Sequence, residues 1–174
     1  GHSLPWVSIY DRVSLESTIS NEYGYYRIRF AEKHLPLTLF FSKQGFLDTS
    51  IYLVPSSPEF INLNLKKRIV LTPVLTDYDS LARSAETTAG TFFTLLNEDP
   101  NAININDTLF RKYQVSLLPY IGTNLKLSGN VINDYSINLL GGYSMGTRQG
   151  ELGFFFNIDR GDVSWLQIAG FGNL

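Results

Sequence analysis

Few side chains in this 174-residue sequence could carry out chemistry, and they are scattered along it. The only imidazoles are His2, near the N-terminus, and His34, in a short turn that ends at Pro36. A zinc site uses several His or Cys ligands, and the sequence contains no Cys. We therefore expect no metal centre, no cofactor and no Cys nucleophile, and we interpret His34 as a solvated turn residue.

The carboxylates offer little more. Asp77 and Asp79 would share a strand face and could hold a calcium ion, but no twelve-residue ligand loop ending in Glu follows them. Capping of a helix by Asp79 is the favoured alternative. Glu98 and Asp99 stand before Pro100 as a turn, with nothing apolar nearby to raise a pKa for acid or base catalysis. No phosphate loop or nucleophile elbow is present, so the sequence predicts a protein that is not an enzyme.

The composition predicts an all-β protein. Aromatic residues make up 14% of the chain and charged residues only 17%, and the residue types that favour strands recur in short runs. The net charge of −2 leaves no basic field to attract nucleic acid, so we exclude that partner. The small basic cluster Lys66–Arg68 is interpreted as a solvated strand face.

Short alternating runs separated by turns fill the first part of the chain, residues 4–76. Because successive strand side chains point to opposite sides, Tyr26, Ile28 and Phe30 would face a core. On the other side, Tyr25, Arg27 and Arg29 form a candidate partner surface, since Tyr and Arg are enriched at binding hot spots. The alternative is a solvated outer face kept soluble by the arginines.

Residues 77–110 have a different pattern. Apolar residues at helical spacing from Leu81 to Leu95 predict one short helix, capped by Asp79 and ended near Pro100. A linker is the alternative reading. The Asn-rich run from Asn101 to Asp107 is expected to mark the boundary between two units.

Alternation returns in residues 111–174, with small polar residues such as Ser136, Asn138 and Ser144 on one face. An apolar outer face with a polar inner face is typical of strands in membrane barrels. Candidate lipid- or partner-facing residues on the outer face are Tyr135, Ile137, Leu139, Tyr143, Phe154, Phe156, Leu166 and Ile168. Trp6 and Trp165 are expected in a core or an interfacial belt, with sugar stacking as an alternative.

An internal repeat lies at the end of the chain. Residues 151–158 align with residues 167–174 at an offset of 16, so Phe155 matches Phe171 and Asn157 matches Asn173. Because the offset is even, matched residues would face the same side of a strand. Chance similarity of two Phe-rich strands is the alternative.

Two families resemble parts of the sequence. The motifs LPWVSI (4–9), TISNEYGYY (18–26) and LFFSKQGF (39–46) resemble the carboxypeptidase regulatory-like domain. This resemblance covers about residues 4–76 and implies a transthyretin-like antiparallel β-sandwich whose first strand is missing. It implies no peptidase chemistry, because the family name refers to an accessory domain.

The motifs QVSLLP (114–119) and SINLLGGYS (136–144), with the repeated Gly-Phe-x-Asn ends, resemble a surface-repeat family of Gram-negative envelope proteins. Such proteins continue with many further repeat units, so the resemblance implies that the chain is a piece of a longer protein. It also implies the bacterial outer membrane as the location, with the N-terminal domain in the periplasm.

Together these observations predict an all-β protein with three parts: a sandwich at 1–76, a linker with a short helix at 77–110, and antiparallel strands of a partial outer-membrane barrel at 111–174. The favoured function is a non-enzymatic structural or interaction component of an outer-membrane protein, or of an assembly or uptake complex. Its partners would be other envelope proteins or the remainder of a longer chain. A soluble envelope module that binds carbohydrate or peptide is the alternative, and a hydrolase is the remote one.

Overall fold

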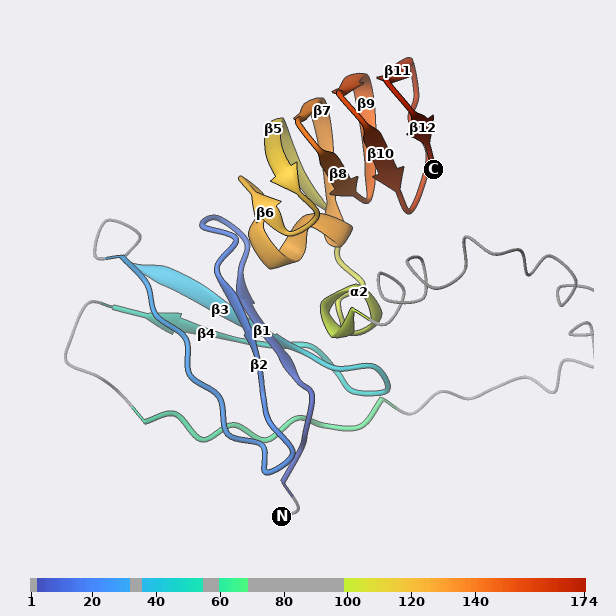
Figure 1. Cartoon of the computed structure of the whole chain (residues 1–174). Helices are drawn as coiled ribbons and strands as arrows, with labels where there is room; N and C mark the ends of the chain where they lie inside the picture. The colour runs from blue at the N-terminus through green and yellow to red at the C-terminus, as the bar shows by residue number, and fades with distance from the viewer. Residues whose placement is uncertain (1–2, 32–35, 55–59, 69–98) are drawn as a thin grey trace, which may run out of the picture.

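The structure, a computed structural model, describes residues 3–31, 36–54, 60–68 and 99–174. These residues are mostly β, in agreement with the all-β class predicted from the sequence. Figure 1 shows two regions, an antiparallel sheet formed by the first part of the chain and a stack of short strands formed by the last part. A short helix lies between them.

The first region, residues 3–68, is called the sheet region. It contains one antiparallel sheet in the order β2-β1-β3-β4. Its strands are β1 (Ser8–Asp11), β2 (Ser17–Ile19), β3 (Leu37–Ser42) and β4 (Thr49–Leu53). In the turn between β1 and β2, the Asp11 carboxylate accepts hydrogen bonds from the backbone N–H and the hydroxyl of Ser14, at 2.6 and 2.8 Å.

Strand β1 pairs with β2 on one side and with β3 on the other. The missing first strand predicts a sheet edge near residues 6–10 that a partner, a loop or a swapped strand covers; in the structure β2 of the same chain lies there. The tight turn after Asp11 brings the chain straight back, and β2 occupies the edge next to β1.

Both faces of this sheet are covered. Ile9, Leu39 and Phe41 are buried on one face, where the extended segments 25–31 and 60–68 pack against them. The alternation predicted for residues 25–30 is present, because Tyr26 and Ile28 are half-buried there. On the opposite face Tyr10 stacks on Phe40, with ring centroids 5.6 Å apart.

The helix α2 (Pro100–Asn104) begins at the proline that was expected to end a helix. Asp99 has extended backbone angles and accepts a hydrogen bond from Asn101 N, and Pro100 occupies the first turn. An Asp-Pro pair stops a preceding helix, but it also satisfies the requirements of a new helix start. The helix predicted between residues 79 and 97 lies outside the described residues.

The second region, residues 109–174, is a β-solenoid, in which each coil of chain stacks on the previous one. Strands β5, β7, β9 and β11 pair in parallel in one sheet, and β8, β10 and β12 pair in parallel in another. The elements are β5 (Leu109–Leu118), β6 (Ile121–Gly122), the 3₁₀ helix η2 (Leu125–Asn130), β7 (Val131–Asn138), β8 (Gly141–Ser144), β9 (Gly146–Gly153), β10 (Phe156–Asp159), β11 (Leu166–Ala169) and β12 (Gly172–Asn173).

The antiparallel, barrel-type arrangement predicted for residues 111–174 is therefore wrong. Only the short hairpin between β5 and β6 is antiparallel there. Each coil runs out along one sheet, turns, and returns along the other, so equivalent residues of successive coils come together. Glu151 pairs with Gln167 and Asn157 with Asn173, which confirms the repeat at an offset of 16.

The two regions are joined by a shared core and by hydrogen bonds. Tyr10 and Leu15 of the sheet region are buried with Leu109, Leu127 and Val131 of the solenoid. The Tyr10 hydroxyl donates to Asp107 Oδ2 at 2.9 Å. The run 101–107, expected to be a boundary, is thus a packed interface.

Candidate interaction surface

The interior of the solenoid is polar and is held by a ladder of asparagines. Asn138 Nδ2 donates to Asn157 Oδ1, and Asn157 Nδ2 donates to Asn173 Oδ1, each at 2.9 Å. Asn138 Oδ1 accepts the hydroxyls of Ser116 at 2.7 Å and Ser136 at 3.1 Å. Asn138 is only 1% exposed, so its amide is a buried group with a full set of partners.

Two glycines give this ladder its space. A Cβ atom on Gly142 would lie 2.0 Å from the side chain of Asn138, and one on Gly153 would lie 2.2 Å from Asn157 Oδ1. No side chain fits at such distances. The glycines in the GGYS and LGF stretches therefore serve to admit the asparagine amides.

Two carboxylates share the same interior. Gln167 Nε2 donates to Glu151 Oε2 and to Asp159 Oδ2, each at 2.8 Å. The pKa of Asp159 is raised from its ordinary 3.8 to about 8, mainly by burial and in addition by the neighbouring Glu151 carboxyl. Hydrogen bonds from Ser144 and Gln167 act in the opposite direction. Near neutral pH the pair holds a proton, which lets two acidic groups remain close together in a largely buried site.

A second polar cluster lies in the first coil. Asn124 Nδ2 donates to Gln114 Oε1 at 2.8 Å and to Asn133 Oδ1 at 2.9 Å. Asn133 Nδ2 donates to Gln114 Oε1 at 2.6 Å. All three side chains are buried. Hydrogen-bonded amides thus fill much of the solenoid interior, beside the smaller apolar clusters around Leu127 and Tyr143.

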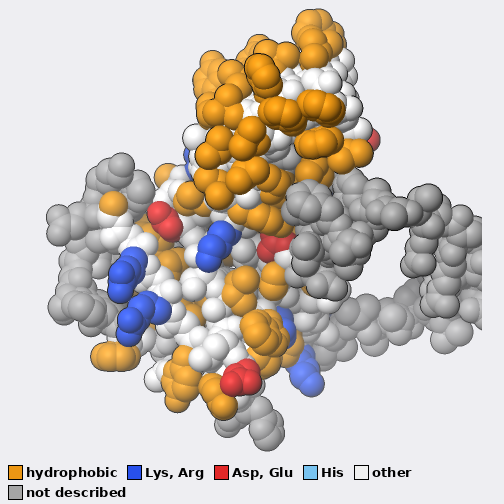
Figure 2. Space-filling view, in the orientation of Figure 1, with side chains coloured by type: hydrophobic (Ala, Val, Ile, Leu, Met, Phe, Trp, Pro, Cys, Tyr) orange, Lys and Arg blue, Asp and Glu red, His pale blue; other side chains and the backbone are white. Residues whose placement is uncertain are grey.

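The exterior of the solenoid is apolar, which is the reverse of the usual arrangement in water. Val115, Ile137, Leu152 and Ile168 occupy matching register positions on four neighbouring strands and are all exposed. Tyr113 and Tyr135 stack beside them, with ring centroids 5.8 Å apart. Figure 2 shows hydrophobic side chains gathered over this part of the molecule, whereas charged side chains are spread over the sheet region below it.

The turns at one side of the solenoid continue this apolar surface. Backbone hydrogen bonds stack each turn on the one before, for example Leu140 N to Leu117 O at 3.0 Å and Phe171 N to Phe155 O at 2.9 Å. The rings of Phe155 and Phe171 are stacked, with centroids 5.1 Å apart. We call this row of turns the apolar edge; it consists of Leu117, Leu118, Leu139, Leu140, Phe154, Phe155 and Phe171.

The opposite side of the solenoid, where the return strands end and the next ones begin, is charged. Arg148 forms an ion pair with Asp134, with Nε donating to Oδ1 at 2.8 Å. Arg160 Nη1 donates to the carbonyl of Gly129 at 2.9 Å. We call this side the charged rim; it consists of Arg111, Lys112, Asp134, Arg148, Arg160 and Asp162. The solenoid therefore has one apolar side and one charged side.

Seven of the eight residues predicted to face lipid or a partner are exposed. These are Tyr135, Ile137, Leu139, Phe154, Phe156, Leu166 and Ile168. Tyr143 is the exception, at 1% exposed. It packs on Ile158 and Tyr120, and its ring fills the space beside Gly129 of η2. The chain's own 3₁₀ helix covers this position, which strand alternation alone does not show.

Other residues of this surface were missed from the sequence. Val115 and Phe171 complete its apolar surface, and the buried Glu151 and the half-buried Asp159 form the carboxyl pair inside. The signal in the sequence was the repeat, whose offset aligns Glu151 with Gln167, the residue that donates to both carboxyl groups.

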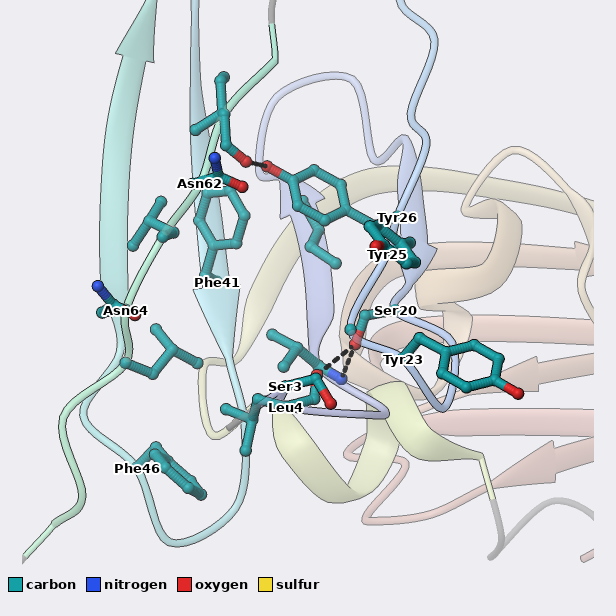
Figure 3. A pocket seen from close by; sticks show the side chains of 16 residues that line it. Ser3, Leu4, Ser20, Tyr23, Tyr25, Tyr26, Phe41, Phe46, Asn62 and Asn64 are labelled. Atoms are coloured by element: carbon teal, nitrogen blue, oxygen red, sulfur yellow. Dashed lines mark hydrogen bonds between the residues drawn. The ribbon is translucent and has the colours of Figure 1, made fainter. Parts of the chain in front are cut away.

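The predicted partner surface Tyr25, Arg27 and Arg29 is exposed along the segment that covers the sheet, away from the solenoid. Beside it lies a groove of about 490 Å³ between the sheet and the segments 25–31 and 60–68. Figure 3 shows Tyr26 crossing this groove, where its hydroxyl donates to the carbonyl of Ile61 at 3.2 Å. Asn62, Asn64 and Tyr23 also line it.

Within the described residues, no three His, Cys, Asp or Glu side chains come together in a way that could hold a metal ion. No helix in that part of the chain is long and apolar enough to cross a bilayer. His2, His34, Asp77 and Asp79, which were weighed as ligands, all lie outside the described residues.

In comparisons with known proteins, no family model matches the chain, and no curated protein or solved structure is significantly similar to it.

Proposed function

We propose that this chain is a non-enzymatic structural module of the cell envelope that attaches to a membrane through its solenoid. The observation that carries this proposal is the inverted distribution of side chains, with amides and carboxyls inside and aliphatic and aromatic groups outside. The polar interior leaves many aliphatic and aromatic side chains outside, and a large exposed apolar surface of this kind marks a membrane or protein interaction site. The expected location, the bacterial outer membrane, rests on the family resemblance of residues 111–174.

The sheet region fits this role as a support. Its antiparallel sheet agrees with the transthyretin-like sandwich proposed for residues 1–76, and segments 25–31 and 60–68 supply the second layer. We propose that this domain lies in the periplasm and holds the solenoid through the packed interface around Tyr10 and Leu109. Tyr25, Arg27 and Arg29 would then be available to other envelope proteins.

Flotation tests the proposal. The full chain is mixed with vesicles of phosphatidylcholine containing a quarter phosphatidylglycerol and centrifuged through a sucrose gradient. We expect the protein to rise with the vesicles, because each buried Leu, Ile or Phe side chain contributes about 1.5–3 kcal/mol. A chain that stays at the bottom of the gradient and is monomeric in sedimentation would contradict the proposal.

A second candidate function is binding of a small ligand in the groove beside Tyr25. Its volume of about 490 Å³ lies in the range of small-molecule sites, and tyrosine hydroxyls and asparagine amides line an apolar floor. Such a lining suits a saccharide or a peptide. Titration calorimetry with a soluble peptidoglycan fragment tests this candidate, and loss of the heat signal in Asn64→Ala but not in Tyr52→Ala would support it.

A further inference from the structure

We infer that the solenoid enters a single leaflet of an anionic membrane edge first, with its apolar edge among the acyl chains and its charged rim at the headgroups. This inference rests on the proposed membrane attachment and adds to it the orientation, the depth and the class of lipid. It follows from the way in which charge, aromatic residues and strand length are arranged across the solenoid.

From β7 onward, the exposed charges of the solenoid lie on one side. From Tyr135 to Thr147 and from Val163 to Leu174 the sequence has no charged residue, and between Gln149 and Ile158 the only one is the buried Glu151. Surfaces of water-soluble domains normally intersperse charges of both signs. Here the apolar edge and the strand halves next to it expose only uncharged side chains.

The charged rim is cationic. Its two arginines at positions 148 and 160, with Arg111 and Lys112, outnumber Asp134 and Asp162. The whole chain has a net charge of −2, so attraction to an anionic membrane must be local. Each basic residue near an anionic surface contributes about 1 kcal/mol of attraction. A cationic rim beside an apolar surface complements acidic headgroups above acyl chains.

Aromatic residues lie at the boundary between the two. Tyr135 and Trp165 line one shallow depression together with Arg148 of the rim, and Trp165 is strongly exposed. Tyr113 stacks on Tyr135 at the same level of the strands. Tyr and Trp with one apolar and one polar end are enriched where membrane meets water. These rings mark the level of the interface on the solenoid.

The strand length then sets the depth. From Tyr135 to Leu139 the chain advances four residues, and at about 3.3 Å per residue this is roughly 13 Å. The hydrocarbon core of a bilayer is about 30 Å thick. The solenoid is therefore long enough for one leaflet and too short for two, which separates this mode of attachment from a spanning one.

A second copy of the chain is the competing occupant of the same apolar surface. A copy would have to cover both the edge and the exposed columns of Ile137 and Leu152, and two cationic rims would approach each other if the copies packed side by side. The charge arrangement therefore favours lipid.

The chain contains no Cys, so single labels test the orientation directly. An environment-sensitive dye is attached at Phe171→Cys on the apolar edge, at Lys112→Cys on the rim and, as a control, at Tyr52→Cys on exposed β4. With the anionic vesicles, we expect the dye at 171 to shift to shorter wavelength and to resist dithionite added outside or trapped inside. The dyes at 112 and 52 should react with external dithionite.

Binding strength provides the second measurement. Phe171→Ser should weaken binding to the anionic vesicles at least about tenfold, as expected for one buried Phe, whereas Tyr52→Ser should not. Phosphatidylcholine vesicles without the acidic lipid should bind several-fold more weakly, and Phe171→Trp should bind as well as the parent chain.

The outcomes separate the two proposals. If the chain does not float with vesicles, the proposed function fails. If it floats but the dye at 171 reacts with external or with trapped dithionite, membrane attachment stands and the single-leaflet inference is overturned. A dye at 171 that is protected without vesicles in a sedimenting dimer would show that a second copy covers this surface and would also overturn the inference.

Discussion

The sheet region and the solenoid are both built from short alternating strands, yet they bury opposite kinds of side chain. In the sheet region Ile9, Leu39 and Phe41 are inside, and the exposed side of the covering segment carries Arg27 and Arg29. In the solenoid Asn138 and Asn157 are inside and Ile137 is outside. Alternation thus shows which residues share a face and leaves open which face is buried.

The difference follows from what fills each interior. In the sheet region two packed layers enclose a space that apolar side chains fill, and burial of their apolar area stabilises the fold. A stack of coils places identical amides directly above one another, so each can donate to the next. A continuous hydrogen-bonded ladder then fills the space between these coils, beside the small apolar cluster of Tyr143 and Ile158.

The largest effect is expected from breaking the ladder. Asn138→Leu keeps the volume but breaks the four buried hydrogen bonds that Asn138 makes with Ser116, Ser136, Glu151 and Asn157, so the unfolding free energy should fall by about 3–5 kcal/mol. Urea unfolding measures this loss. Asn173→Leu, at the exposed end of the ladder, is the matched control and should lower the unfolding free energy by less than about 1 kcal/mol. An unchanged midpoint for Asn138→Leu would mean that the interior does not depend on polar contacts.

In the sheet region, the harmful change should be the loss of a buried apolar side chain. Leu39→Ala removes a side chain that is 1% exposed, and the cavity should lower the unfolding free energy by about 3 kcal/mol. Ile137→Ala, in the solenoid, changes a side chain that is 51% exposed and should cost less than about 1 kcal/mol in water. If urea unfolding gave equal losses of unfolding free energy for the two variants, the two regions would not differ in which side chains their interiors depend on.

The buried carboxyl pair makes the solenoid sensitive to pH in a way that the sheet core is not. Because the pKa of Asp159 is raised to about 8, the folded chain keeps a proton that the unfolded chain releases near pH 4. This favours the folded state at low pH, and the advantage is lost as pH rises from about 4 to 8. Asp159→Asn should remove that dependence.

Thermal unfolding at pH 5 and pH 8 measures this effect. At pH 8 we expect Asp159→Asn to melt at least about 2 °C above the parent chain, the shift that roughly 1 kcal/mol produces. Asp134→Asn, which removes a carboxyl of the exposed ion pair with Arg148, is the control and should leave the slope between the two pH values unchanged. A parent chain whose melting temperature does not fall toward pH 8 would rule out the shared proton.

The smallest effect concerns the contact between the two regions. Tyr10→Phe keeps the ring stacked on Phe40 and removes only the hydrogen bond to Asp107, so the loss should be about 1 kcal/mol. In an Asp107→Asn background the same substitution should cost less, and the difference measures the coupling. Identical costs in the two backgrounds would show that this bond does not link the regions.

The sequence alone identified the all-β class and most of the exposed apolar residues, because strand alternation is a local property of the chain. Its repeat matched Phe155 with Phe171 and Asn157 with Asn173 as residues on the same face, and the structure stacks each matched pair. Likewise, the alternation of residues 25–30 separated Ile28, which packs on the sheet, from Arg27, which is exposed.

Three features were decided only by the tertiary structure. A period of two is the same in parallel and antiparallel strands, so the direction of pairing followed from the turn at Leu139–Leu140, which ends one strand and sends the chain back to form a coil. Asp99-Pro100 is compatible with the end or the start of a helix, and packing of α2 between the two regions selected the start. Strand alternation places Tyr143 on the outside. It is buried because η2 and Tyr120, which belong to an earlier part of the chain, pack over it.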